Sequence, residues 1–138
     1  MPQNAYEEPI PYEMRVFCYQ ARNLPIMDMT GSSDPKVYAN FLASEAHSKV
    51  HKKTTDPQFF QTLIISANLR PNVLKMSAQG MDTLVPPLQI KVFDQDPGRT
   101  KEFMGQVYIP LSEAIIFQNE MKENMEKNNN HDINDPSN

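Results

Sequence analysis

The chain has 138 residues, of which 39% are hydrophobic and 22% charged, and its formal net charge is -4. This length and composition predict one globular domain with a substantial core, and the acidic balance excludes binding of nucleic acid through bulk positive charge. The single cysteine, Cys18, is expected to be a buried thiol in a reducing, cytoplasmic compartment. No apolar run approaches the roughly 20 residues of a membrane span, and no signal peptide precedes the domain, so we expect a soluble chain, whole or cut from an anchored protein.

Most of the chain alternates between apolar and polar residues. Residues 1–11 contain three prolines and two adjacent glutamates, a composition that predicts a flexible arm. Residues 12–21 then place Met14, Val16 and Cys18 on one face, which is the pattern of a β-strand. The same kind of pattern predicts further strands at residues 36–42, 49–55, 59–66, 88–93 and 104–109.

The remaining segments lack this alternation. Residues 67–87 are irregular and predict a surface excursion with one helical turn or none. Ser112 and Glu113 precede an apolar run and predict a capped helix that runs to Lys127. Residues 128–138 contain almost nothing apolar and are predicted to be disordered. Strands at intervals of about ten residues, joined by Pro, Gly and Asp turns, predict an antiparallel β-sandwich over residues 12–127.

Acidic side chains gather in the loop that follows the strand at residues 88–93. This strand delivers Asp94 and Asp96 to a Pro-Gly turn, and Glu102 returns from the far side of the turn. Alternate side chains of a nearly extended segment point the same way, so Asp94 and Asp96 are expected to face one direction. Like charges this close destabilise a loop unless a cation lies among them, and ligands that offer only oxygen atoms favour calcium over magnesium.

Another acidic loop, residues 24–35, carries Asp28 and Asp34; because it comes earlier in the chain, it is the first acidic loop, and the loop with Asp94 and Asp96 is the second. Asp in a turn rich in Pro, Gly and Ser commonly bonds nearby backbone N–H groups, so ordinary turn chemistry also explains either residue alone. Five acids in two loops that a sandwich can bring together favour a shared cation site. An EF-hand is excluded because the twelfth residue counted from Asp94 is Gly105 and no helices are predicted beside the loop.

The acids of both loops, with Pro35 after Asp34 and Gly105 after Glu102, resemble the calcium-loop signature of C2 domains, the calcium and lipid modules of protein kinase C and synaptotagmins. The match covers about residues 12–112 and, at residues 19–24, 86–87, 93–96 and 102–105, is most similar to a middle C2 domain of a ferlin. Ferlins carry several such domains before a membrane anchor and act in calcium-dependent vesicle fusion and membrane repair. The resemblance implies an all-β Greek-key sandwich of eight strands. Only six are predicted here, which suggests an incomplete excision.

The resemblance also implies a function: calcium-dependent binding of anionic phospholipid by a domain that lies peripherally on membranes. The expected calcium ligands are the carboxylates of Asp28, Asp34, Asp94, Asp96 and Glu102 and the backbone carbonyls of Met27 and Gln95. Arg99, beside the site, would contact a lipid headgroup. The alternative is a module of the same fold that needs no calcium and binds a neighbouring domain or protein through a sandwich face or an open strand edge.

Two further residue sets have open interpretations. The basic set comprises His47, Lys49, His51, Lys52 and Lys53. It is either a solvated strand face or a phosphoinositide site, in which Lys49 and Lys53 would share one face of a strand. Met27 and Met29 flank Asp28 and either dip into lipid or cover the end of the sandwich. No Ser/His/Asp or Cys/His arrangement is present, so the sequence predicts a binding module and not an enzyme.

Overall fold

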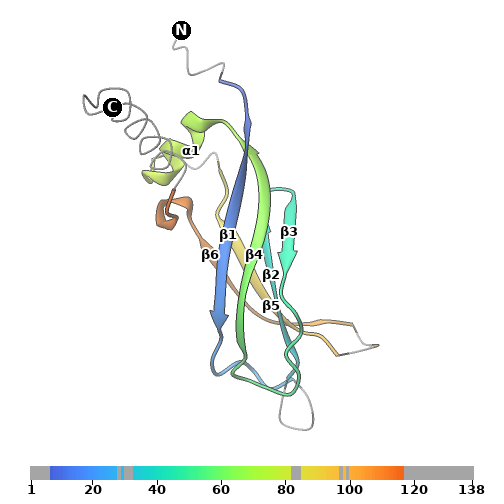
Figure 1. Ribbon diagram of the computed structural model, residues 1–138. Helices are drawn as coiled ribbons and strands as arrows, with labels where there is room; N and C mark the ends of the chain where they lie inside the picture. Colours follow the sequence, from blue (N-terminus) through green and yellow to red (C-terminus); the bar gives the residue numbers. More distant parts are fainter. Residues whose placement is uncertain are drawn as a thin grey trace, which may run out of the picture.

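The structure is a computed structural model that describes residues 7–27, 29, 33–81, 85–96, 98 and 100–116. This part of the chain forms six strands, one α-helix and one 3-10 turn (Figure 1). Their order is β1 (Ile10–Gln20), β2 (Pro35–Phe41), β3 (Ser44–His47), β4 (Gln58–Leu69), α1 (Pro71–Ala78), β5 (Leu88–Asp94), β6 (Glu102–Ile109) and η2 (Leu111–Glu113). Within the described ranges, no helix is long and apolar enough to cross a membrane.

The strands form two antiparallel sheets that pack face to face, which confirms the predicted β-sandwich. β1 pairs with β4 along most of its length in a two-stranded sheet. The second sheet has the strand order β3-β2-β5-β6, so β2 and β5 are neighbours although a long stretch of sequence separates them. Figure 1 shows α1 at one end of the sandwich, away from the loops that join β1 to β2 and β5 to β6.

The hydrophobic core lies between the inward faces of the two sheets. Phe41 on β2 and Ile65 on β4 are almost completely buried, with exposed fractions of 2% and 1%. Complete burial of such a side chain contributes about 1.5–3 kcal/mol to the free energy of unfolding. Cys18 packs against this core from β1 but is only half-buried, and its partial burial raises the pKa of the thiol.

The prediction of a strand at residues 49–55 is wrong, because the strand at this point is β3, which ends at His47. The buried Ser48 causes the departure: its side-chain Oγ accepts the Val37 N–H at 2.9 Å, a bond that a backbone carbonyl would otherwise make. Beyond it, the His51 N–H still bonds the Pro35 carbonyl, but Lys53 has a φ of 54° in the left-handed region. An L-residue rarely adopts that conformation within a strand, so the segment continues as an irregular loop beside β2.

The helix predictions also differ from the structure where it describes the chain. The only α-helix of the described residues is α1, eight residues within the segment expected to hold at most one turn. Its start is explained by Pro71 at the first helical position, where the missing N–H costs nothing. The predicted C-terminal helix begins as the 3-10 turn η2, which contains Ser112 and starts after Pro110 without a side-chain cap, and Ala114 after it is extended. The rest of that predicted helix, from residue 117 on, lies outside the described residues.

The ends of the domain also differ from the prediction. Ile10 and Pro11 were expected in the flexible arm but are the first residues of β1, in register with the last residues of β4. Pairing with β4 therefore orders a segment whose proline content predicted a loop. The tail predicted to be disordered, residues 128–138, lies outside the described part of the chain.

Candidate functional site

The ends of two neighbouring strands bring residues from the two acidic loops together. Asp34 immediately precedes β2, and Asp94 is the last residue of β5. The antiparallel register places Pro35 opposite Asp94, so Asp34 lies beside the point where the second loop begins. A proline is tolerated at the first position of a strand because its missing N–H is not needed there. The Asp-Pro pair thus ends one loop and starts β2 at the same place.

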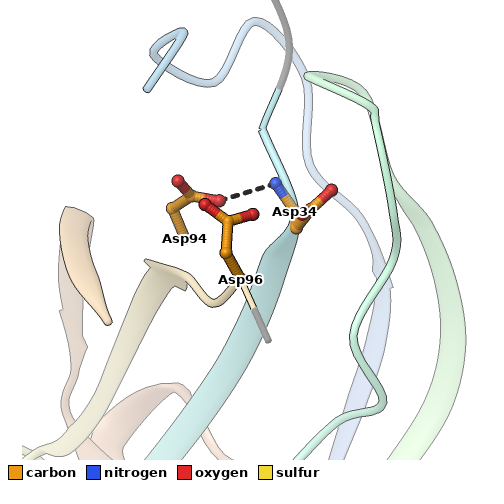
Figure 2. A group of neighbouring side chains, drawn as sticks. All are labelled: Asp34, Asp94 and Asp96. Carbon is orange, nitrogen blue, oxygen red and sulfur yellow. Dashed lines mark hydrogen bonds between the residues drawn. The ribbon is translucent and has the colours of Figure 1, made fainter. Parts of the chain in front are cut away.

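Three carboxyl groups meet at this point. Side-chain oxygens of Asp34, Asp94 and Asp96 all lie within 4.8 Å of one another, as Figure 2 illustrates. Asp34 and Asp94 are buried, with exposed fractions of 9% and 3%, and Asp96 is half-buried. Two oxygen ligands of one calcium ion are at most about 5 Å apart, because each lies about 2.3–2.6 Å from the ion. The spacing of the three carboxylates therefore fits ligands of a single hard cation.

Backbone hydrogen bonds hold the two loops together around the cluster. The Asp34 N–H donates to Asp94 Oδ1 at 2.7 Å, the dashed line in Figure 2. In the opposite direction, the Gln95 N–H donates to the Asp34 carbonyl at 2.9 Å. The Lys53 N–H donates to Asp34 Oδ1 at 2.6 Å, so the irregular segment after β3 also supports the site. Each bond joins segments far apart in the sequence, which makes the cluster a product of tertiary structure.

The surroundings of the cluster favour the charged form of Asp34. A hydrogen bond with the Asp96 carboxyl group lowers the pKa of Asp34, and the Lys53 N–H and the charges of Lys52 and Lys53 lower it further, while burial opposes them. The site therefore holds negative charge that a proton or a metal ion must offset. Ligands that are all oxygen atoms favour a hard divalent ion in that role.

The buried Ser33 fastens the first loop. Its exposed fraction is 0%, its Oγ accepts the Met27 N–H at 2.9 Å, and it donates to the Pro25 carbonyl at 2.8 Å. The Ser33 carbonyl accepts the Thr54 N–H at 2.8 Å. The sequence analysis missed this role, although a serine directly before Asp-Pro in a turn was a signal for a side chain that bonds nearby backbone groups. Ser33 thereby holds the loop beside Asp34.

The other expected calcium ligands are placed differently. Glu102 is the first residue of β6, opposite Asp94, but it is exposed and lies outside the group of three carboxylates. Met27 is half-buried beside Ser33, and Gln95 lies between the two acids of the second loop. Asp28 lies outside the described residues. Among described residues, strands and not helices flank the second loop, which agrees with the exclusion of an EF-hand.

The structure describes three of the four residues expected to contact lipid. Met29 is completely exposed, with a fraction of 106%, and Arg99 lies outside the described residues. Lys49 and Lys53 are exposed, but their segment is not a strand, so the alternation expected to place them on one face is absent. The Lys49 N–H bonds Gln61 Oε1 on β4, whereas the Lys53 N–H bonds Asp34. The two lysines therefore belong to different parts of the loop.

A basic and aromatic group that the sequence analysis missed lies on the outer face of the second sheet. Lys101 Nζ is 4.2 Å from the ring centroid of Tyr38 and 4.5 Å from that of Phe93. Lys36 Nζ is 5.3 Å from the Tyr38 centroid. These side chains come from β2, β5 and the segment before β6, so only the strand register brings them together.

Comparisons with known proteins give one consistent result. A family model described as "C2 domain" matches residues 12–129. Synaptotagmin-1 of Caenorhabditis elegans is 34% identical over 107 residues, which cover 75% of this chain and 22% of that protein. Mouse myoferlin is 29% identical over 97 residues, which cover 69% of this chain and 4% of that protein. The chain thus spans much less than two thirds of these relatives, and the similarity to myoferlin agrees with the ferlin resemblance seen in the sequence.

Among solved structures, the chain is similar to the calcium-bound pair of C2 domains, A and B, of extended-synaptotagmin 2. The TM-score is 0.56 at 23% identity, over 81% of this chain and 38% of that chain. A likeness at this identity establishes the sandwich architecture alone. The loops at the end of the sandwich must therefore be judged from the residues of this chain.

Proposed function

Because this chain belongs to the C2 domain family, we propose that it binds anionic phospholipid membranes in a calcium-dependent manner through Asp34, Asp94 and Asp96. The observation that carries the proposal is the convergence of three carboxylates, two of them buried, within 4.8 Å. The domain would lie peripherally on the membrane surface.

The proposed mechanism is an electrostatic switch. Without calcium, the acids of the two loops repel a membrane rich in anionic lipid; bound calcium supplies positive charge and open coordination positions for lipid oxygens. Asp34, Asp94 and Asp96 would hold the inner ligand positions. Asp28, Glu102 and the carbonyls of Met27 and Gln95 would complete the protein's share. This division follows the geometry, which groups the first three and leaves Glu102 exposed.

Residues around the site would add to the membrane contact. Met29 is completely exposed beside the first acidic loop and would contribute apolar contact with lipid. Lys53 is exposed and its backbone bonds Asp34, so its ammonium group would lie beside a headgroup at the cation site. Arg99 and Lys49 are proposed as further contacts. Each lysine or arginine near an anionic surface contributes only about 1 kcal/mol, so the calcium site and not the basic residues would decide binding.

Co-sedimentation with vesicles tests the proposal. Wild-type protein is expected to pellet with vesicles containing phosphatidylserine when calcium is present, and to remain in solution with a chelator or with phosphatidylcholine alone. The Asp94→Asn, Asp96→Asn double variant is expected to lose this binding because two of three grouped carboxylates lose their charge. The matched control removes two exposed charges elsewhere, with Asp56→Asn and Glu113→Gln, and should bind like wild type. Equal pelleting of the double variant and wild type would refute the switch.

A second candidate function has a specific observation in its favour. Val107 on β6 pairs with Ile90, which in turn pairs with the fully buried Ala39, so Val107 faces the inner side of the sandwich. Nevertheless 51% of Val107 is exposed, and the inward residues of β1 are only half-buried. This uncovered inner surface favours a calcium-independent module that binds a strand of a neighbouring domain. Calorimetry separates the two candidates, since binding heat with calcium alone supports the first and its absence the second.

The role of a larger parent protein is a further proposal. The chain covers 4% of myoferlin and 22% of the synaptotagmin, so those proteins contain much more than this domain. The ferlin resemblance favours a multi-domain parent with several C2 domains that acts in vesicle fusion or membrane repair. In such a protein this domain would supply membrane attachment and no catalytic step.

A further inference from the structure

Tyr38 is buried where a side chain should be exposed. Its neighbours Val37 and Ala39 face the core, so Tyr38 points to the outer face of the four-stranded sheet. Its exposed fraction is nevertheless 7%. The ring is covered by the ammonium group of Lys101 at 4.2 Å and by the edge of Phe93 at a centroid distance of 5.4 Å. Two further groups, Lys36 and His47, lie 5.3 Å and 5.8 Å from the ring centroid.

The hydroxyl group of this fixed ring reaches the second acidic loop. Tyr38 OH donates a hydrogen bond to Gln95 Oε1. Gln95 lies between Asp94 and Asp96, and its backbone N–H donates to the Asp34 carbonyl at 2.9 Å. Gln95 is therefore held through both its side chain and its backbone, and the two holding groups come from one strand and the residue before it.

Tyr38 contacts both arms of the loop between β5 and β6. Gln95 is on the outgoing arm, directly after β5, and Lys101 is on the returning arm, directly before β6. The hydrogen bond holds the first arm and the cation–π contact holds the second. A loop that is ordered before its ligand arrives loses less conformational entropy on binding, which increases affinity.

We propose that Tyr38 is a positioning residue for the metal site, which clamps both arms of this loop so that the Asp94 and Asp96 carboxylates face Asp34. The inference rests on the proposed calcium site and adds a residue that contacts no ion. Its effect passes through Gln95, whose side chain bonds Tyr38 while the carboxylates of the neighbouring aspartates belong to the cluster. Loss of the hydroxyl group frees Gln95 and increases the range of positions open to Asp94 and Asp96.

Calorimetric titration of the full chain with calcium, without lipid, tests this role. Tyr38→Phe keeps the ring under Lys101 and removes only the donor, and it is expected to weaken calcium affinity by about three- to tenfold, the effect of one lost hydrogen bond. Gln95→Met removes the acceptor with little change in volume and should give a similar loss. Because both variants break the same bond, the double variant should be no weaker than either single variant.

The same sheet face offers a matched control. The Tyr108 hydroxyl group accepts a hydrogen bond from Gln89 Nε2 at 2.9 Å, toward the other end of β5 and β6. Tyr108→Phe breaks a bond of the same kind away from the carboxylates. Both Tyr→Phe variants are expected to lower the calcium-free melting temperature slightly, but only Tyr38→Phe should weaken calcium binding.

The outcomes distinguish this inference from the proposed function. If wild type binds calcium, and if both variants, Tyr38→Phe and Gln95→Met, bind it with the same affinity, then Tyr38 has no positioning role. The proposed calcium site would still stand in that case. If wild type gives no calcium heat, the proposed function fails and the positioning role fails with it. Should Tyr38→Phe not fold, the Gln95→Met titration alone decides, because it leaves the ring in place.

Discussion

Replacing Asp94 by Asn should make the calcium-free protein more stable while removing its response to calcium. Asp94 is 3% exposed, and its side-chain oxygens lie within 4.8 Å of those of Asp34 and Asp96. The pKa of Asp34 is lowered, so its carboxylate is charged near neutral pH and repels the Asp94 carboxylate. At 4.8 Å and an effective dielectric constant of about 20, that repulsion is about 3.5 kcal/mol.

A smaller effect opposes this gain. Asp94 Oδ1 accepts the Asp34 N–H at 2.7 Å, and a neutral amide oxygen in the same place accepts more weakly, by about 1 kcal/mol. Repulsion is the larger effect, so we expect Asp94→Asn to raise the free energy of unfolding of the calcium-free protein by roughly 1–3 kcal/mol. For a domain of this size the melting temperature should rise by about 4–12 °C.

Thermal melting followed by circular dichroism measures both parts of the prediction. In chelator, Asp94→Asn should melt above wild type. Calcium at about 100 times its dissociation constant should stabilise wild type by about 2.7 kcal/mol and leave the variant unchanged. Asp56→Asn is the control, because hydrogen bonds from Asn23 and Thr55 lower the pKa of that exposed carboxyl group and its charge is already favourable. A variant that melts at or below wild type in chelator, or that still responds to calcium, would refute the reasoning.

Two further predictions concern the calcium-free fold. The pKa of Asp34 is lowered in the folded state, so its contribution to stability is complete above the unfolded value of about 3.9 and is lost as the pH falls through the folded pKa. Asp34→Asn should therefore reduce the loss of unfolding free energy between neutral pH and a pH of about 3, measured by urea unfolding. Ser33→Ala should lower the free energy of unfolding by about 1–3 kcal/mol, because it leaves the Met27 N–H and the Pro25 carbonyl without their partner. Ser77→Ala is its matched control, since this buried hydroxyl group has no hydrogen-bond partner within the described ranges and its loss should be neutral or stabilising. Equal losses in both serine variants would contradict the assigned role of Ser33.

The sandwich could be predicted because its strands carry a local signal. Alternation of apolar and polar residues is a property of each strand by itself, so β1, β2, β4, β5 and β6 were found to within a few residues of their ends. The prediction of a strand at residues 49–55 was wrong because the Ser48 side-chain hydroxyl, and not a backbone carbonyl, accepts the Val37 N–H. Nothing in the local pattern distinguishes that serine from one on a strand surface.

The start of the predicted C-terminal helix also differs from the structure. Ser112 and Glu113 have the residue types of a helix start, but they lie inside the 3-10 turn η2, after which Ala114 is extended. Helical residue types specify an α-helix only when tertiary packing supports it. Although η2 contacts α1, it remains a 3-10 turn. Within residues 111–116, the described part of that segment forms a single 3-10 turn.

The sequence by itself determined that the chain forms a β-sandwich and that two of its loops carry acidic residues. The spacing of Asp94 and Asp96 is local, because two residues of extended chain return a side chain to the same side. That Asp34 joins them, and that Glu102 stays exposed, was decided by the register of β2 against β5 and of β5 against β6. Register depends on contacts between segments far apart in the chain, and so does the reach of Tyr38 to Gln95. Periodicity specifies which residues share a face, whereas only the paired strands specify which faces and ends meet.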